Sequence, residues 1–461
     1  MKKYFTITEG KGGVAEMLAI ALPMIVSTAC DGIMTFTDRL FLSRQGSEQM
    51  NAAMGGGVAM QMLMFFFIGL TGYTTALVAQ YFGSGQKKMG AVVAYQGMLI
   101  ALLAYPIILL ARPLALYFFD FMHVPPEQLG FQTEYFNIVI FGSVISILRN
   151  VLSCYFSGLG RTRIVMVAAL VAVTVNVGLD YVMIFGKLGF PVMGVRGAAL
   201  ATVAGSISAL LVLAIAYVGR KNWHEFHVAA SFRFNAGVMR KLLYFGYPAG
   251  LEFFLNFLAF TAIIFMFYSQ GTVVATASTI MFNWDLVSFI PLLGIEIAVT
   301  SLVGRYMGAG DPDTAHRAAM SGIKTGILYS VVILLLFVFI PELLVRVFSP
   351  SESSSTFNQA VPIAKTMIRI ASLYVLAEAM MVALVGALRG AGDTHWTMVA
   401  SVTFHWTFVP LLAIMFYVLK MSPVAGWLAL VILFLVFCFV LFMRYRGGKW
   451  RNIRVVEAPV S

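Results

Sequence analysis

Six acidic residues lie inside long apolar stretches of this chain: Asp31, Asp38, Asp180, Glu252, Asp285 and Glu378. If those stretches cross a membrane, a charged side chain near the middle of each costs about 2.5–3.5 kcal/mol on insertion scales. Six such residues would be a heavy burden unless they had a use. We therefore expect most of them to face the protein interior or a water-filled cavity, where a carboxylate can bind or carry an ion.

Spacing groups these acids with amide side chains on shared helical faces. The groups are Asp31 with Asp38, seven residues apart, and Asn176 with Asp180 and Glu252 with Asn256, each four residues apart. Residues four or seven apart lie one above the other on a helix. An amide one turn from a carboxylate can hydrogen-bond it or help it to hold a small cation, and oxygen-rich clusters suit a proton or Na⁺. The alternative for any single acid is a protonated carboxyl that bonds a neighbouring backbone group.

The composition requires lipid as the solvent for most of the chain. Of 461 residues, 60% are hydrophobic and 11% are charged, whereas a soluble domain carries about 25% charged residues. The three cysteines are far apart, so neither a disulfide framework nor a zinc site is expected, and no metal is predicted beyond Na⁺ at the acids named above. The net charge of +11 sits in loops, as in membrane proteins, so no nucleic-acid partner is expected.

Apolar stretches long enough to span a bilayer recur twelve times. The predicted spans lie near 14–42, 52–82, 89–111, 131–156, 163–186, 194–219, 242–268, 273–307, 317–347, 362–388, 395–419 and 424–444. A few exceed 25 residues, which favours tilted or bent helices. Basic residues gather on the side where even-numbered spans end. The positive-inside rule then predicts a multi-pass protein of the bacterial inner membrane with both termini in the cytoplasm.

The two halves of the chain resemble each other. Pro23 corresponds to Pro248 and Gly69 to Gly294 at an offset of 225, and the segment 157–162 pairs with 389–394 at an offset of 232. Each half holds six spans, so the halves must be parallel repeats related by an axis along the membrane normal. Transporters use this arrangement to bind substrate between two rocking halves; duplication without transport is the alternative. We predict an amino lobe (1–219), a basic cytoplasmic linker (220–241) and a carboxy lobe (242–461).

These segments resemble the multidrug and toxic compound extrusion (MATE) family of the flippase-like MOP superfamily over nearly the whole chain. The resemblance rests on LVAQYFGSG at 77–85, LVGRYMGAGD at 302–311, the stretch from Ser157 to Thr202 and LRGAGDT at 388–394. It implies an all-α, V-shaped bundle that exports amphipathic, often cationic, organic compounds in exchange for H⁺ or Na⁺. Such a protein needs no cofactor, is not an enzyme, and works in the bilayer as a monomer.

The resemblance also assigns residues. Asp38 matches the family's first-span acid, Asn176 and Asp180 its fifth-span pair, and Thr202 a hydroxyl beside them; together they form an amino-lobe cation site. Glu378 matches an acid used by a branch with a carboxy-lobe sodium site. Where that branch has a seventh-span glutamate, this chain has Asn256, with the acid one turn earlier at Glu252.

The amino lobe is therefore the preferred coupling site. Glu252, Asn256, Asp285 and Glu378 are predicted as a second cation or substrate site, and Asp31 as an accessory residue. Other classes stay open, among them an exporter or flippase of a lipid-linked or endogenous metabolite within the same superfamily. That alternative predicts more cationic side chains in the cavity than Arg149 and Arg369. An ATP-driven pump is disfavoured because no GxxxxGK[ST] phosphate-binding loop is present.

Overall fold

The structure, a computed structural model, describes residues 10–121, 124–349 and 355–457, and within these residues every regular element is helical. The first half contains α1 (Val14–Ser43), α2 (Ser47–Gly72), α3 (Thr74–Gly83), α4 (Lys87–Leu110), α5 (Arg112–Phe121), α6 (Pro126–Phe141), α7 (Ser143–Gly158), α8 (Thr162–Phe185) and α9 (Val195–Val218). The second half contains α11 (Ala236–Tyr268), α12 (Thr272–Gly308), α13 (Pro312–Phe339), α14 (Pro341–Arg346), α15 (Ser355–Ala371), α16 (Val375–Ala391), α17 (Thr394–Ala413) and α18 (Pro423–Arg446).

Ten helices, or helix pairs in line, are long and apolar enough to span a membrane, and two bent pairs raise the count to twelve. One pair is α6 and α7, bent by 48° at Gly142, and the other is α15 and α16, bent by 50° just before Val375. The bends fall at corresponding positions of the two halves. The prediction of an all-helical protein with twelve spans is thereby confirmed.

Polar residues and prolines set several helix starts. Pro312 occupies the first turn of α13, where its missing N–H costs nothing, and Asp311 caps the helix by accepting a hydrogen bond from the Thr314 backbone N–H at 2.9 Å. Ser422 caps α18 in the same way, ahead of Pro423. Local sequence thus fixes where these spans begin, and the apolar run that follows fixes their length.

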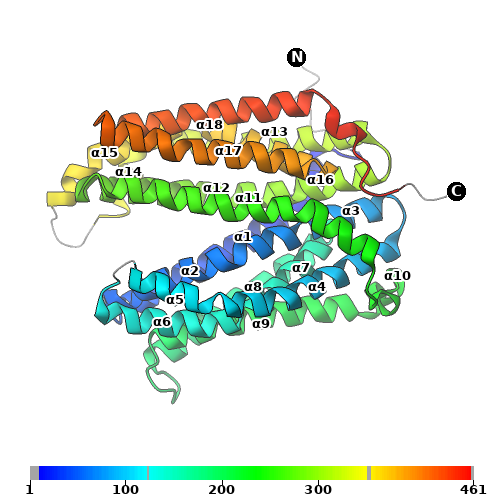
Figure 1. The fold of residues 1–461 in the computed structure, drawn as a ribbon, viewed down its shortest axis with the longest axis horizontal. Helices are drawn as coiled ribbons and strands as arrows, with labels where there is room; N and C mark the ends of the chain where they lie inside the picture. The colour runs from blue at the N-terminus through cyan, green and yellow to red at the C-terminus, as the bar shows by residue number, and fades with distance from the viewer. Residues whose placement is uncertain (1–9, 122–123, 350–354, 458–461) are drawn as a thin grey trace.

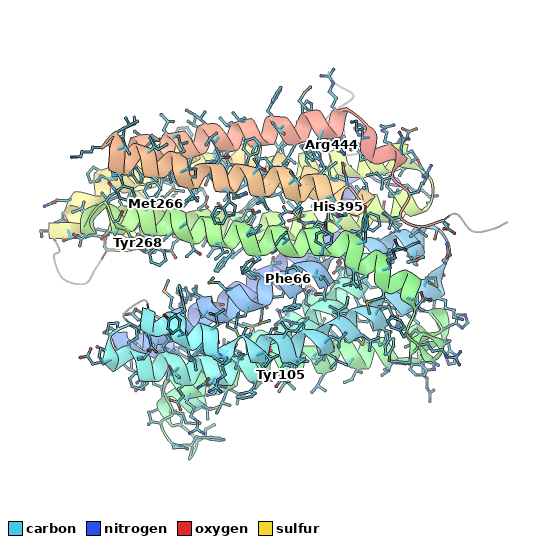
Figure 2. The ribbon with its side chains drawn as sticks, viewed as in Figure 1. Phe66, Tyr105, Met266, Tyr268, His395 and Arg444 are labelled. Atoms are coloured by element: carbon cyan, nitrogen blue, oxygen red, sulfur yellow. The ribbon has the colours of Figure 1, made fainter. Side chains whose placement is uncertain are left out.

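The two halves form a V. Figure 1 shows α4–α9 in the lower half and α11–α18 in the upper half, with the halves apart at one end and together at the end that carries α10 (Arg220–Glu225). Phe66 lies where the halves meet, and Met266 and Tyr268 lie at the diverging end (Figure 2). The first and last described segments both contact the closed end, since the Gly12 N–H bonds Tyr306 and Gln86 bonds the Glu457 carbonyl.

The seam between the halves is built from backbone contacts that occur twice. A Cβ atom on Gly83 of α3 would lie 1.8 Å from the carbonyl oxygen of Arg305 in α12, and one on Gly308 would lie 2.0 Å from that of Gln80. Gln80 and Arg305 are 225 residues apart, as are Gly83 and Gly308. The two contacts are therefore the same contact related by a two-fold axis between the halves.

A second pair of seam contacts follows the same rule. A Cβ on Gly69 of α2 would lie 2.8 Å from the Cα of Gly250 in α11, and one on Gly294 of α12 would lie 2.9 Å from the Cα of Ile25 in α1. These residues again differ by 225. The structure thus confirms the two parallel six-helix repeats that the sequence predicts.

The stretch expected as a polar linker (220–241) is folded against the first half. It contains α10 and a 3₁₀ turn (Val228–Ser231), and Phe226 and Val228 are fully buried among core residues of that half. Tyr155 of α7 donates a hydrogen bond to Asn222 at 3.2 Å. Helix α11 already begins at Ala236, so the last six residues of the expected linker belong to the seventh span.

Candidate ion-coupling sites

Asp38 is the centre of a buried polar cluster in the first half. Its carboxylate, 5% exposed, accepts a hydrogen bond from Asn176 Nδ2 of α8 at 3.1 Å and one from Thr202 Oγ1 of α9 at 2.9 Å. Each carboxylate oxygen thus has one donor, and the two donors come from different helices. The structure brings together these three residues that the sequence predicts as a site.

Asp180 lies one turn after Asn176 on α8 and is fully buried. Neither of its carboxylate oxygens has a hydrogen-bond partner among the described residues, and the Asn176 Oδ1 atom has none either. Asp180 interacts electrostatically with Asp38. Two neighbouring carboxylates without water or counter-charge cannot both stay ionised cheaply, so this cluster is built to take up a proton or a small cation.

Close packing of α8 and α9 positions the cluster. A Cβ on Gly205 of α9 would lie 3.0 Å from the Ala172 carbonyl oxygen and 3.1 Å from the Asn176 Cβ, both on α8. A larger residue at that position would push the helices apart. The missing side chain therefore lets Thr202, one turn earlier on α9, stay within reach of Asp38.

Asp31 lies apart from this cluster. Its side chain is 47% exposed and forms an ion pair of 2.6 Å with Arg149 of α7. The seven-residue spacing places Asp31 and Asp38 on one side of α1, but the neighbours change along that helix. Residues of α8 and α9 bond Asp38, whereas α7 supplies the cation at Asp31.

The second half holds a polar cluster at the bend between α15 and α16. Tyr374, directly before α16, donates its hydroxyl to Asp285 of α12, and Glu378 lies one turn further along α16. Asp285 and Glu378 interact electrostatically, and the Glu378 Oε2 atom is buried without a hydrogen-bond partner in the described part of the chain. The bend thus joins two of the predicted carboxy-lobe acids in one site.

Glu252 belongs to a different cluster. Arg389 of α16 bonds Glu252 of α11 at 3.3 Å and also pairs with Glu296 of α12, so two buried carboxylates share one guanidinium. Asn256, one turn after Glu252, donates to Ser401 of α17 at 2.8 Å. The four residues predicted as one carboxy-lobe site are therefore divided between separate sets of contacts.

Comparison with known proteins agrees with this architecture. The MatE family model matches residues 23–182 and 248–414, one segment in each half. The chain belongs to the MatE family. The two matched segments begin 225 residues apart, at the prolines that mark the internal repeat.

Relatives of this MatE protein include named drug-resistance proteins. The chain is 25% identical over 447 residues to the probable multidrug resistance protein NorM of Thermotoga maritima, covering 96% of this chain and 94% of that protein. It is 28% identical over 400 residues to the multidrug resistance protein PmpM of Pseudomonas aeruginosa, covering 85% and 81%. This MatE chain is thus a multi-pass membrane protein of a multidrug efflux transporter family.

The fold matches a solved structure described as the outward-facing conformation of a multidrug resistance MATE family transporter of the MOP superfamily. The TM-score is 0.86 at 19% identity, with 97% of this chain and 100% of that chain covered. At that identity the likeness concerns the fold, including the V formed by the two halves.

Three residues of this MatE chain join the clusters without being singled out by the sequence. Tyr135 of α6, 7% exposed, lies beside Asp38, Asp180 and Thr202. Glu296 and Arg389 complete the cluster at Glu252. Arg389 stands in the LRGAGDT segment, so a buried cation there was a usable signal; nothing in the spacing around Tyr135 or Glu296 pointed to either.

Proposed function

We propose that this MatE protein is a secondary active antiporter that exports amphipathic, often cationic, organic compounds in exchange for H⁺ or Na⁺. The observation that carries the proposal is the buried pair of Asp38 and Asp180. It combines two carboxylates, one amide and one hydroxyl with three buried oxygen atoms that have no partner in the described residues. The names of the drug-resistance relatives support the substrate class.

Coupling would act through α1, which carries Asp38 and touches both halves. Protonation or cation binding at the acid pair removes its negative charge and with it the reason for Asn176 and Thr202 to hold the Asp38 carboxylate. Helix α1 can then shift against α8 and α9 and change the surface offered to a substrate. Release of the ion on the other side restores the charge and the bonds.

The membrane energises such a cycle without ATP. One charge moving down about 100 mV supplies about 2.3 kcal/mol. Each pH unit adds about 1.4 kcal/mol. In the proposed orientation both termini and α10 face the cytoplasm, and the V is open to the outside. The lobes at 1–219 and 242–461 rock about the glycine seam within a single monomer.

The cluster of Asp285, Tyr374 and Glu378 is a second candidate ion site. The unpartnered Glu378 oxygen supports it, as does its position at a bend that can straighten. Glu252 is less suited to ion exchange because Arg389 already neutralises part of the charge around it. The alternative of a lipid-linked substrate is less favoured, since the exposed Arg149 is paired with Asp31 and offers little free positive charge to an anionic substrate.

The test is ethidium efflux from bacterial cells that lack their own drug pumps and express this chain, with acid and sodium pulses applied separately. Asp38→Asn is compared with Asp313→Asn, a matched acid-to-amide change at an 87% exposed side chain. Efflux by wild type and Asp313→Asn, but not by Asp38→Asn, on one pulse supports the proposal and identifies the ion. If well-expressed wild type moves no organic cation on either pulse, the proposal is wrong and an endogenous or lipid-linked substrate becomes the better hypothesis.

A further inference from the structure

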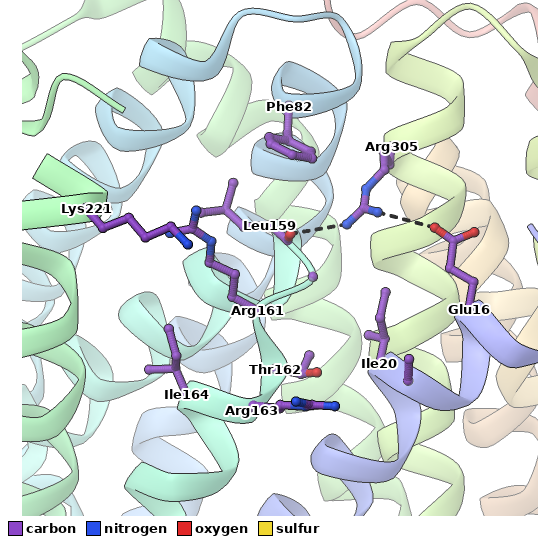
Figure 3. Close-up of a pocket in the computed structure, with 12 residues that line it drawn as sticks. Glu16, Ile20, Phe82, Leu159, Arg161, Thr162, Arg163, Ile164, Lys221 and Arg305 are labelled. Carbon is purple, nitrogen blue, oxygen red and sulfur yellow. Dashed lines mark hydrogen bonds and ion pairs between the residues drawn. The ribbon is translucent and has the colours of Figure 1, made fainter. Parts of the chain in front are cut away.

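A cavity of about 620 Å³ lies between the halves at the closed end of the V. Its walls come from the start of α1, the end of α3, the turn before α8, α10 and α12 (Figure 3). Side chains of Ile20, Phe82 and Ile164 provide apolar surface. The cavity is thus bounded by both repeats, at the level where the membrane-spanning helices start and end.

The cavity carries an excess of positive charge. Four of its lining side chains are cationic: Arg161, Arg163, Lys221 and Arg305. Arg161 is paired with Glu225 at 2.5 Å, and Arg305 with Glu16 at 3.4 Å. Arg163 and Lys221 are exposed and have no acidic partner in the described part of the chain. Two cations therefore remain free to bind an anion.

Hydrogen-bond donors in the same cavity lack acceptors. Helix α8 begins here and runs for 24 residues, so its first backbone N–H groups carry the positive end of the helix dipole. Thr162, its first residue, is 1% exposed and its hydroxyl has no partner, and the Arg305 Nε–H is also buried without one. Phosphate, with several acceptor oxygens and a negative charge, fits this set of donors.

The repeat shows what normally fills this place. A Cβ on Gly160 would lie 2.4 Å from Arg305 Nη2, at the cavity. Its counterpart Gly392, 232 residues later, faces Val455 and Ile453 of the chain's own tail, with distances of 2.5 and 3.2 Å from the corresponding Cβ. The tail thus covers one flank of the closed end with apolar side chains. The other flank, with the cavity, has apolar walls and cations but no such cover.

We propose that this cavity binds a phosphate-bearing anion, supplied as the headgroup of an anionic lipid from the leaflet at the closed end. The cations and the α8 start hold the phosphate, and the apolar walls take the adjoining glycerol and acyl carbons. Basic pockets between membrane helices recognise anionic headgroups in this way. Because the site joins α12 of one half to α8 of the other, a bound lipid favours the conformation in which this end is closed.

The test uses the purified full chain in nanodiscs of phosphatidylcholine, titrated with phosphatidylglycerol, with bound lipid counted by native mass spectrometry. The pocket variant Arg163→Gln/Lys221→Gln is compared with Arg233→Gln/Arg240→Gln, which removes the same charge from exposed residues outside the cavity. At about 1 kcal/mol per cation, the pocket variant should bind phosphatidylglycerol about 30-fold more weakly, and the control should bind nearly as wild type does.

Two further arms fix the chemistry. Thr162→Val keeps every charge and removes the hydroxyl, and should weaken phosphatidylglycerol binding about tenfold. Inorganic phosphate at millimolar concentration distinguishes the sources: failure to displace the lipid supports the headgroup, and displacement from wild type supports the phosphate site but overturns its assignment to lipid. Equal loss of binding in the pocket and control variants, or no loss in either, overturns the proposal.

Discussion

The buried acid pair leads to opposite expectations for two similar substitutions. Asp38→Asn removes an ionised acceptor that has a donor on each oxygen, so we expect it to destabilise the protein by about 1.5–3 kcal/mol. Asp180→Asn brings donors to a place where three buried oxygens of Asp180 and Asn176 have no partner. Relief of unsatisfied buried groups is worth about 1–3 kcal/mol, so Asp180→Asn should stabilise the protein. Both variants should lose ion-coupled export.

The measurement is thermal unfolding of purified protein at one pH, followed with a thiol-reactive fluorophore. The chain suits this assay because Cys30 and Cys438 are buried and react only when the helices separate. Asp313→Asn is the control and should melt with wild type. If Asp180→Asn lowers the melting temperature as far as Asp38→Asn does, Asp180 has favourable partners in the folded protein, and the argument from its unpartnered oxygens is refuted.

Three other predictions concern the scaffold. Arg389→Gln leaves two buried glutamates without their cation and should destabilise the protein by about 3–5 kcal/mol, seen as a lower melting temperature that neutralising one of those glutamates partly restores. Gly83→Ala places a Cβ against a backbone carbonyl and should cost about 1–3 kcal/mol, whereas Gly130→Ala, with open space around it, should cost almost nothing; equal melting points would contradict the seam contact. Asp311→Ala removes the α13 cap and should cost about 1 kcal/mol. Hydrogen bonds from the Thr314 side chain and backbone hold the pKa of Asp311 below its usual range, so this stabilisation is present at neutral pH and lost as pH falls through that lowered pKa; a difference between variant and wild type that persists in acid would contradict it.

Hydropathy predicts most of the fold because each span must bury its own backbone bonds and cover about the same thickness of hydrocarbon. The twelve spans and the two-fold repeat follow from that constraint and from the repeated glycine and proline positions. The bends at Gly142 and before Val375 could not be located from sequence, since nothing local distinguishes them from straight helix. The folded linker was also missed, because Phe226 and Val228 are too few to show as an apolar element.

The candidate site was predictable where its residues share a helix. A spacing of four places Asn176 and Asp180 together whatever the rest of the chain does. Contacts between helices depend on how each helix is rotated against its neighbours, which spacing does not determine. For that reason Tyr135 was not found, and Glu252 was grouped with Asp285 although its partner is Arg389.

The repeated seam has a consequence for the ancestry of the chain. Surfaces that meet themselves across a two-fold axis form an isologous interface, the kind that joins identical subunits. The seam is such an interface inside one polypeptide, which means that a six-helix ancestor could assemble as a homodimer before its gene was fused. A homodimer must carry every feature in duplicate. Fusion removed that restriction, so Gln80 and Arg305 now differ at equivalent positions, and a single acid pair at Asp38 and a single cationic cavity serve the whole molecule.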